Sequence, residues 1–130
     1  MQYLGNSPWG EIDCCEELYP GIYLVSTPSH GGIQIEWESA MLLSPAARKC
    51  GFLEGGSLWF EEDCCEQVVL RELLDKGLWQ IPARIKEPNA FERSLNSTIE
   101  EYHPEYWADR QKQLNKAAKP RRKSCKNISR

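Results

Sequence analysis

Two short segments of the chain hold the residue types best suited to chemistry. Residues 26–32 contain His30, one of the two histidines in the protein. Three carboxylates in a row, Glu61, Glu62 and Asp63, follow later in the chain. An imidazole beside a carboxylate can act as a general base or bind a metal ion. If the fold brings the two segments together, the histidine and these acids are the catalytic or metal-binding constellation that the sequence offers.

The loop around His30 also suits binding. Glycine lets a backbone approach a phosphate or another chain closely and tolerates positive φ. Hydroxyl groups beside the glycines add hydrogen-bonding capacity. The loop residues expected to contribute to binding are Ser26, Thr27, Ser29, Gly31 and Gly32. The alternative is a hairpin turn in which these residues satisfy the backbone of the loop itself. No lysine follows the glycines as in a phosphate-binding loop, which favours the turn.

The three consecutive acids have two interpretations. The sequence predicts a helix over residues 61–76, and acids in the first turn of a helix are stabilised by its dipole. Consecutive helical residues point about 100° apart, so at most two of the carboxylates converge. Solvated acids at a helix start are therefore the favoured interpretation. A divalent cation or a basic partner is the alternative.

A β-hairpin is expected to carry the histidine loop. Residues 22–26 are mostly β-branched, aromatic or aliphatic and follow a Tyr-Pro-Gly turn, as is typical of a strand. Residues 33–37 alternate apolar and polar side chains, the pattern of a half-buried strand. A connecting loop with proline and two glycines favours antiparallel pairing of 22–26 with 33–37.

Helical patterns dominate the rest of the chain. Apolar residues recur at helical spacing over 61–76, and Gly77 provides a stop signal. Residues 88–102 and 105–116 predict two further helices separated by Pro104. The fold class expected is α+β: a small antiparallel sheet packed against the 61–76 helix and the C-terminal helices. Residues 1–116 are expected to form a single domain, and residues 117–130 a basic, flexible tail.

The six cysteines are expected to be reduced. The sequence shows no secretion signal and no apolar run long enough for a membrane span, so we expect a cytoplasmic protein without membrane contact. Buried structural thiols are the favoured interpretation. A zinc site would draw on Cys14, Cys15, Cys64, Cys65 and His30. Adjacent cysteine pairs lack the usual spacing of zinc ligands, which argues against this site, and we expect neither a metal nor another cofactor.

The charge is distributed unevenly. Residues 1–108 carry seven Lys/Arg and eighteen Asp/Glu, a net charge of −11, whereas residues 109–130 carry nine Lys/Arg and one Asp, a net charge of +8. An acidic body therefore ends in a basic tail, and the two parts should have different partners. The tail residues Arg121, Arg122 and Lys123 suit contacts with nucleic-acid phosphates. The alternative is a solubilising or autoinhibitory segment that folds against the acidic body.

Three segments resemble a family of small proteins of unknown function. They are Pro8-Trp9-Gly10, Ser26 to Gly32, and Trp59 to Cys64 leading into an aliphatic helix. The resemblance covers residues 8–107 and implies no activity. It implies a context, because that family is common on phages, plasmids and integrating elements. The basic tail and the doubled cysteines depart from the family pattern.

The first functional hypothesis is a non-enzymatic accessory protein of a mobile element. Its acidic body would bind a host protein or nucleoprotein complex. The resemblance implies a role as an inhibitor of host defence. The alternative is a small metal- or histidine-dependent hydrolase or nucleic-acid-processing enzyme using His30 with Glu61, Glu62 or Asp63. A further alternative is a nucleic-acid-binding regulator acting through the basic tail.

Overall fold

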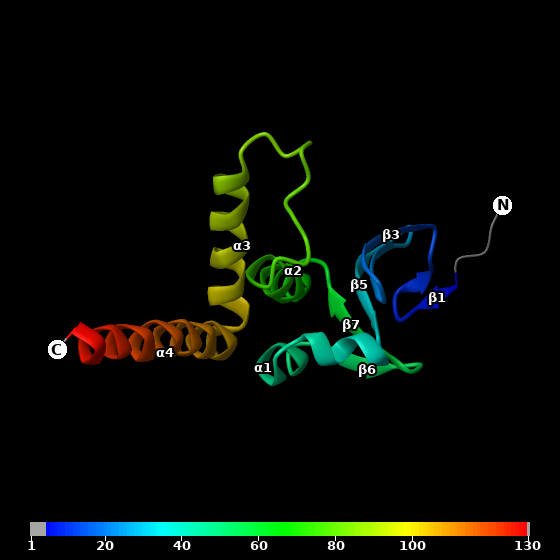
Figure 1. Cartoon of the computed structure of the whole chain (residues 1–130). Coiled ribbons are helices and arrows are strands. Elements are labelled where there is room, and N and C mark those ends of the chain that lie inside the picture. The colour runs from blue at the N-terminus through cyan, green and yellow to red at the C-terminus, as the bar shows by residue number, and fades with distance from the viewer. Residues whose placement is uncertain (1–4, 130) are drawn as a thin grey trace.

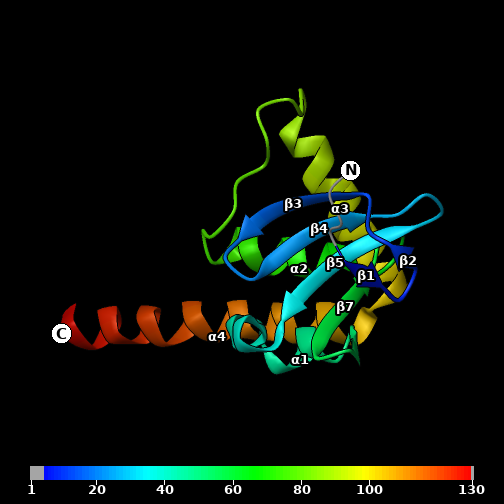
Figure 2. The ribbon, with the colours of Figure 1, turned by 90° about the vertical axis from the view of Figure 1, so that its right-hand side faces the viewer.

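The protein has an α+β fold in which helices cover one face of an antiparallel sheet (Figures 1 and 2). The computed structural model describes the backbone of residues 5–129 and the side chains of residues 5–117. The sheet has five strands in the order β3-β4-β5-β7-β6. Their bounds are Cys14–Tyr19 for β3, Ile22–Ser26 for β4, Gly31–Glu36 for β5, Phe52–Glu54 for β6 and Ser57–Glu61 for β7.

Shorter elements fill the N-terminal half. A separate two-stranded ribbon consists of β1 (Asn6–Ser7) and β2 (Gly10–Glu11). Between β5 and β6 lie a 3-10 helix, η1 (Trp37–Leu42), and the short helix α1 (Pro45–Arg48). The hydroxyl of Ser44 accepts a hydrogen bond from the Ala47 N–H at 3.2 Å, which caps α1 at its N-terminus.

The predicted hairpin of residues 22–26 and 33–37 is confirmed as the pair β4 and β5. The second strand begins earlier than expected, at Gly31, so both loop glycines belong to β5 and neither has a positive φ. The positive φ that glycine tolerates is therefore not used at either position. They provide close packing instead, because a Cβ on Gly32 would overlap the carbonyl oxygen of Phe60 and the indole of Trp9.

The predicted helix over residues 61–76 is too long at its N-terminus. Residues 57–61 form strand β7, and the helix α2 spans Glu66–Asp75. The difference arises from Gly55 and Gly56, whose φ angles of 61° and 82° form a tight turn between β6 and β7. The apolar residues after this turn continue a hairpin. Glu61 ends β7, and Glu62 and Asp63 lie in the turn between β7 and α2, before the first turn of the helix.

Two hydrophobic clusters lie on opposite faces of the sheet. The strand β7 contributes to both, because its side chains alternate: Leu58 and Phe60 face the helices, whereas Trp59 packs with Ile12 and Val25 on the other face. The larger cluster includes four apolar residues of α2, which are Val68, Val69, Leu70 and Leu73. The sheet is thus buried on both faces around β7, and this strand is well fixed in place.

Two long helices complete the fold. The predicted helix from Pro88 to Tyr102 is confirmed as α3 (Pro88–Tyr102). It packs on α2 through Leu95 and Ile99. The last helix, α4 (Pro104–Ser129), starts where the sequence predicts and projects away from the sheet (Figure 1). It continues through the segment for which a flexible tail is expected. Within residues 5–129, no helix is long and apolar enough to cross a membrane.

Candidate functional site

The end of the sheet at which β4 turns into β5 brings the two predicted segments together. β5 and β7 run antiparallel, and Gly32 lies opposite Glu61 in their register. His30, the residue before β5, therefore lies beside the residues that end and follow β7. A backbone hydrogen bond of 3.1 Å from the Glu62 N–H to the Gly31 carbonyl extends this pairing past the last residue of β7.

His30 contacts two carboxylates, one with each ring nitrogen. Nδ1 lies 3.2 Å from Oε1 of Glu62, and Nε2 lies 3.5 Å from Oε2 of Glu61. The side chains of His30, Glu61 and Glu62 are 29%, 47% and 44% exposed, so the site is open to solvent. Asp63 is also exposed. The structure therefore gathers His30 and the three predicted acids on one open surface, which we call the acidic turn site.

The loop before His30 is held by one threonine. The Thr27 hydroxyl donates to the carbonyl of His30 at 2.7 Å and accepts from the His30 N–H at 3.1 Å. It also accepts from the Ser29 N–H at 3.4 Å. Thr27 is 8% exposed, so its hydroxyl serves the loop backbone and not a ligand. Ser26 lies nearby and donates to Oδ1 of Asp13 at 3.4 Å.

Trp9 fixes the imidazole from the other side. Its ring meets the His30 ring edge-on, with the centroids 5.6 Å apart and the planes at 72°. Close contact between Trp9 and the sheet is possible because Gly32 has no side chain. The Gly31 N–H donates to Oε1 of Glu62 at 3.1 Å, so this carboxylate is positioned by the backbone of the same strand. Tryptophan and glycines thus orient the His30–Glu62 pair.

Two adjacent groups of side chains have the spacing of metal ligands. His30, Glu62 and Asp63 each offer one ligand atom, and these atoms lie within 4.8 Å of one another. The same holds for Glu61, Cys64 and Cys65 in the next part of the turn. Imidazole and carboxylate ligands suit borderline divalent ions, whereas thiolates favour softer ones.

The arrangement constrains acid–base chemistry. A histidine acting as a general base needs one ring nitrogen that reaches the substrate. In this structure both nitrogens of His30 face carboxylates, so the Nε2 atom becomes available only when Glu61 turns away. Glu61 is exposed, which permits that movement. As it stands, the geometry suits a cation or a cationic group better than proton abstraction.

The cysteines do not assemble into the zinc set considered from the sequence. Cys14 and Cys15 are exposed on the edge strand β3, so the expectation that they are buried is wrong. Cys64 and Cys65 are partly buried in the turn before α2, with their Sγ atoms 3.0 Å apart. Burial raises the pKa of Cys65 to about 12, which favours the neutral thiol.

Two titratable residues near the turn were missed from the sequence. Glu66, at the start of α2, has an Oε1 atom that is buried without a hydrogen-bond partner. Burial, helped by the charges of Glu62 and Asp63, raises its pKa to about 8. His103, between α3 and α4, has its pKa lowered by burial. The position of Glu66 on an apolar helix face could have indicated a buried acid. No sequence pattern indicated that His103 would be buried.

His103 lines a cavity of about 420 Å³ that is separate from the acidic turn site. Its walls come from α1, from the end of α3 and from the start of α4, including Cys50 and Tyr106. Neither His30 nor residues 61–63 line it. The predicted nucleic-acid contacts Arg121, Arg122 and Lys123 also lie apart, on the backbone of α4, and their side chains fall outside the described residues.

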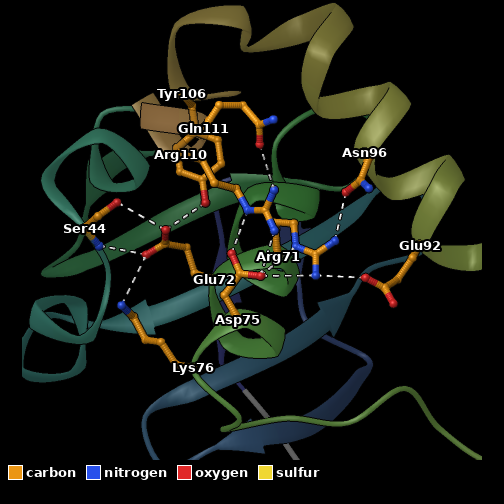
Figure 3. A network of polar contacts seen from close by, with 10 residues as sticks. All are labelled: Ser44, Arg71, Glu72, Asp75, Lys76, Glu92, Asn96, Tyr106, Arg110 and Gln111. Carbon is orange, nitrogen blue, oxygen red and sulfur yellow. Dashed lines mark hydrogen bonds and ion pairs between the residues drawn. The ribbon is translucent and has the colours of Figure 1, made fainter. Parts of the chain in front are cut away.

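A second polar cluster lies between the helices, and its members Arg71, Glu72 and Tyr106 are buried (Figure 3). Glu72 accepts hydrogen bonds from the Ser44 N–H at 2.8 Å and from the Tyr106 hydroxyl at 2.7 Å. Arg71 reaches Asn96 at 2.9 Å and Glu92 at 2.9 Å. Asp75 links Arg71 to Arg110 in α4. We call this set the interhelix network; it joins α1, α2, α3 and α4.

Comparison with protein families identifies the kind of domain. A family model described as Domain of unknown function (DUF7007) matches residues 2–129, nearly the whole chain. The chain belongs to this family. The resemblance to proteins of unknown function is thereby confirmed, and the motifs that carried it meet at the acidic turn site of this DUF7007 domain. No curated protein and no solved structure matches the chain significantly.

Proposed function

We propose that this DUF7007 protein is a non-enzymatic binding protein whose acidic turn site engages a basic surface of another macromolecule. The observation that carries the proposal is the convergence of Glu61, Glu62 and Asp63 on an open surface around His30. The partner class is a host protein or nucleoprotein complex. The biological context is that of an accessory protein of a mobile element, and inhibition of host defence is the role proposed for it.

The charge of the sheet half supports this choice. Residues 1–65, which build the whole sheet, carry two Lys/Arg and ten Asp/Glu, a net charge of −8. Asp13 lies at the same end of the sheet, because its N–H bonds to the Ser26 carbonyl at 2.9 Å and Ser26 pairs with Gly31. Acids without neighbouring cations create a negative field that attracts basic partners and speeds their association.

A salt titration tests the electrostatic basis. A fluorescent peptide rich in arginine and lysine serves as the probe, and its affinity for the full chain is measured at increasing salt. Because exposed charges are screened within about 8 Å at physiological salt, we expect affinity to fall steeply as salt rises. Affinity that does not change with ionic strength contradicts the proposal.

A matched pair of charge variants locates the binding surface. The triple variant Glu61→Gln, Glu62→Gln, Asp63→Asn removes three charges from the acidic turn site. The control Glu100→Gln, Glu101→Gln, Glu105→Gln removes three exposed charges from α3 and α4. We expect the first to weaken probe binding at least about tenfold, roughly 1.4 kcal/mol, and the second to have a much smaller effect. Equal effects would place binding elsewhere.

A second candidate function is a small histidine-dependent hydrolase or nucleic-acid-processing enzyme. The distance of 3.2 Å between Nδ1 of His30 and Oε1 of Glu62 favours it, because a carboxylate that orients an imidazole is a recurrent catalytic pair. The variant His30→Ala separates the candidates. A folded His30→Ala protein that keeps its cellular activity eliminates the enzyme, whereas a complete loss with unchanged probe binding supports it.

A further inference from the structure

One group within the acidic turn site has the composition and spacing of a metal centre. We propose that His30, Glu62 and Asp63 bind a divalent transition-metal ion of the zinc class. This goes against the expectation from the sequence that the protein holds no metal. It goes beyond the proposed function, because an ion held by Glu62 and Asp63 would neutralise two of the three acids of that surface and so compete with a basic partner.

The His30–Glu62 distance fits two ligands of one ion. Zinc bonds to nitrogen and carboxylate oxygen are about 2.0–2.2 Å long, so two ligands in a tetrahedral arrangement lie about 3.3 Å apart. The Nδ1 and Oε1 atoms are 3.2 Å apart. This pair can therefore bind the same ion without a change of backbone, and a ligand atom of Asp63 lies within 4.8 Å of both. Asp63 is exposed, so its carboxylate can close the third position.

The ligand types select the class of ion. Magnesium and calcium prefer sites made of oxygen atoms, whereas an imidazole ligand suits zinc and its neighbours in the transition series. Two carboxylates together with a neutral imidazole balance the charge of a divalent ion.

Groups outside the ligand set already hold the ligands in place. The Gly31 N–H fixes the Glu62 carboxylate, and the Trp9 ring fixes the imidazole. The carbonyl of Glu62 accepts a hydrogen bond of 3.0 Å from Nε2 of Gln67, which anchors the turn to α2. Such outer contacts orient metal ligands and strengthen binding. The two ligand segments are joined by the pairing of β5 with β7.

Cobalt(II) titration of the metal-free full chain tests the proposal. Cobalt(II) reports its ligands by absorption, and thiolate ligands add an intense charge-transfer band in the near ultraviolet. We expect one ion per chain with the visible ligand-field bands of tetrahedral cobalt(II) and no thiolate band, and displacement by zinc but not by a similar concentration of magnesium. A thiolate band would instead assign the ion to Glu61, Cys64 and Cys65 and overturn the proposal, as would displacement by magnesium.

Matched variants complete the test. We expect His30→Ala and Asp63→Asn each to weaken cobalt binding at least about tenfold, and circular dichroism should show that both remain folded. The variant Cys64→Ser, Cys65→Ser changes the neighbouring group, and Glu100→Gln removes a distant exposed acid; both should bind as the parent does. Unchanged binding by His30→Ala, or no binding by the parent at millimolar cobalt, overturns the proposal.

The test of the metal site can be separated from the test of the proposed function. Probe-peptide binding is measured with and without a chelator. If the metal is absent but binding of the basic peptide remains salt-sensitive, the metal site fails and the acidic binding surface stands. If cobalt binds as expected but the affinity for the peptide does not change with ionic strength, the metal site stands and the proposed function fails.

Discussion

The interhelix network and the acidic turn site use the same kinds of side chain in opposite ways. In the network, Glu72 is 8% exposed and its oxygens meet the Ser44 N–H and the Tyr106 hydroxyl. In the acidic turn site, Glu61 is 47% exposed and its contact is one edge of His30 at 3.5 Å. The first cluster holds four helices together, whereas the second leaves carboxylate oxygens facing solvent.

This difference separates a structural role from a functional one. Burying a charge is costly unless hydrogen bonds replace the lost water, and the network supplies those bonds. Burial and the charge of Glu72 raise the pKa of Tyr106, which keeps its hydroxyl protonated as a donor. The acidic turn site pays no such desolvation cost, and its acids remain available to a partner or a metal ion. Variants at the two sites should therefore differ in what they damage.

The largest effect is expected from Glu72→Ala. Removing this carboxylate leaves the Ser44 N–H and the Tyr106 hydroxyl buried without their acceptor, and breaking such a buried set costs about 4 kcal/mol. Urea unfolding measures the loss. The control Glu100→Ala, exposed on α3, should change stability by less than about 0.5 kcal/mol. Similar losses in the two variants would contradict the structural role of the network.

Glu66 sharpens the comparison, because it is a buried acid without the partners that Glu72 has. Its pKa rises from 4.5 to about 8 on folding. Between these values the folded state keeps a proton that the unfolded state has lost, so stability falls as the pH rises through this range. Each pKa unit corresponds to about 1.4 kcal/mol, and we expect a total fall of about 3 kcal/mol after some relaxation.

The variant Glu66→Gln should remove this fall, so that it is more stable than the parent at pH 8 and close to it at pH 5. Urea midpoints at the two pH values measure the change. The charges of Glu62 and Asp63 add to the effect of burial on the pKa of Glu66, and the variant leaves both acids in place. The control Glu100→Gln should keep the pH dependence of the parent, and an unchanged slope in Glu66→Gln would refute the role of Glu66.

Gly32→Ala tests the support of the acidic turn site. The added methyl group overlaps the Phe60 carbonyl and the Trp9 ring, and overpacking of this kind costs about 2 kcal/mol. Displacement of Trp9 should also loosen His30 and weaken cobalt binding. Gly55→Ala is a useful comparison, since no atom lies near its Cβ position but its φ is 61°: it should lose stability and keep cobalt affinity.

The smallest effect on stability is expected from His30→Ala. Exposed ion pairs contribute about 0–1 kcal/mol, so this variant should unfold within about 0.5 kcal/mol of the parent. Its binding of cobalt should nevertheless fall sharply. Thermal unfolding and cobalt titration of the same preparation measure both quantities. A large loss of stability would show that His30 has a structural role, as the residues of the interhelix network do.

The sequence predicted the parts of the fold that depend on local patterns. The β4–β5 hairpin and α3 follow from alternating and helical spacing of apolar residues, and both are confirmed. The helix over 61–76 began too early because a short apolar run fits either a strand or a helix. The Gly55-Gly56 pair was the decisive signal, since two glycines between apolar runs indicate a hairpin.

The site depended on information that local patterns do not contain. Residue types alone indicated the candidate residues His30, Glu61, Glu62 and Asp63. Their proximity requires β5 to pair with β7, and the elements η1, α1 and β6 separate these two strands in the sequence. Glu66 and Glu72 interrupt the same apolar helix face, yet Glu72 has partners from α1 and α4 and Glu66 has none for its Oε1 atom. Only the tertiary contacts distinguish them.

The edge-on contact of Trp9 with His30 gives the acidic turn site an intrinsic fluorescence signal. Open-shell metal ions quench the fluorescence of a nearby indole, and the ring centroids of Trp9 and His30 are 5.6 Å apart. Binding of an open-shell ion such as cobalt(II) at His30 should therefore lower the emission of the unlabelled protein. Metal binding can therefore be screened without an attached dye. The variant Trp9→Phe keeps an aromatic ring on the sheet and should lose this fluorescence change.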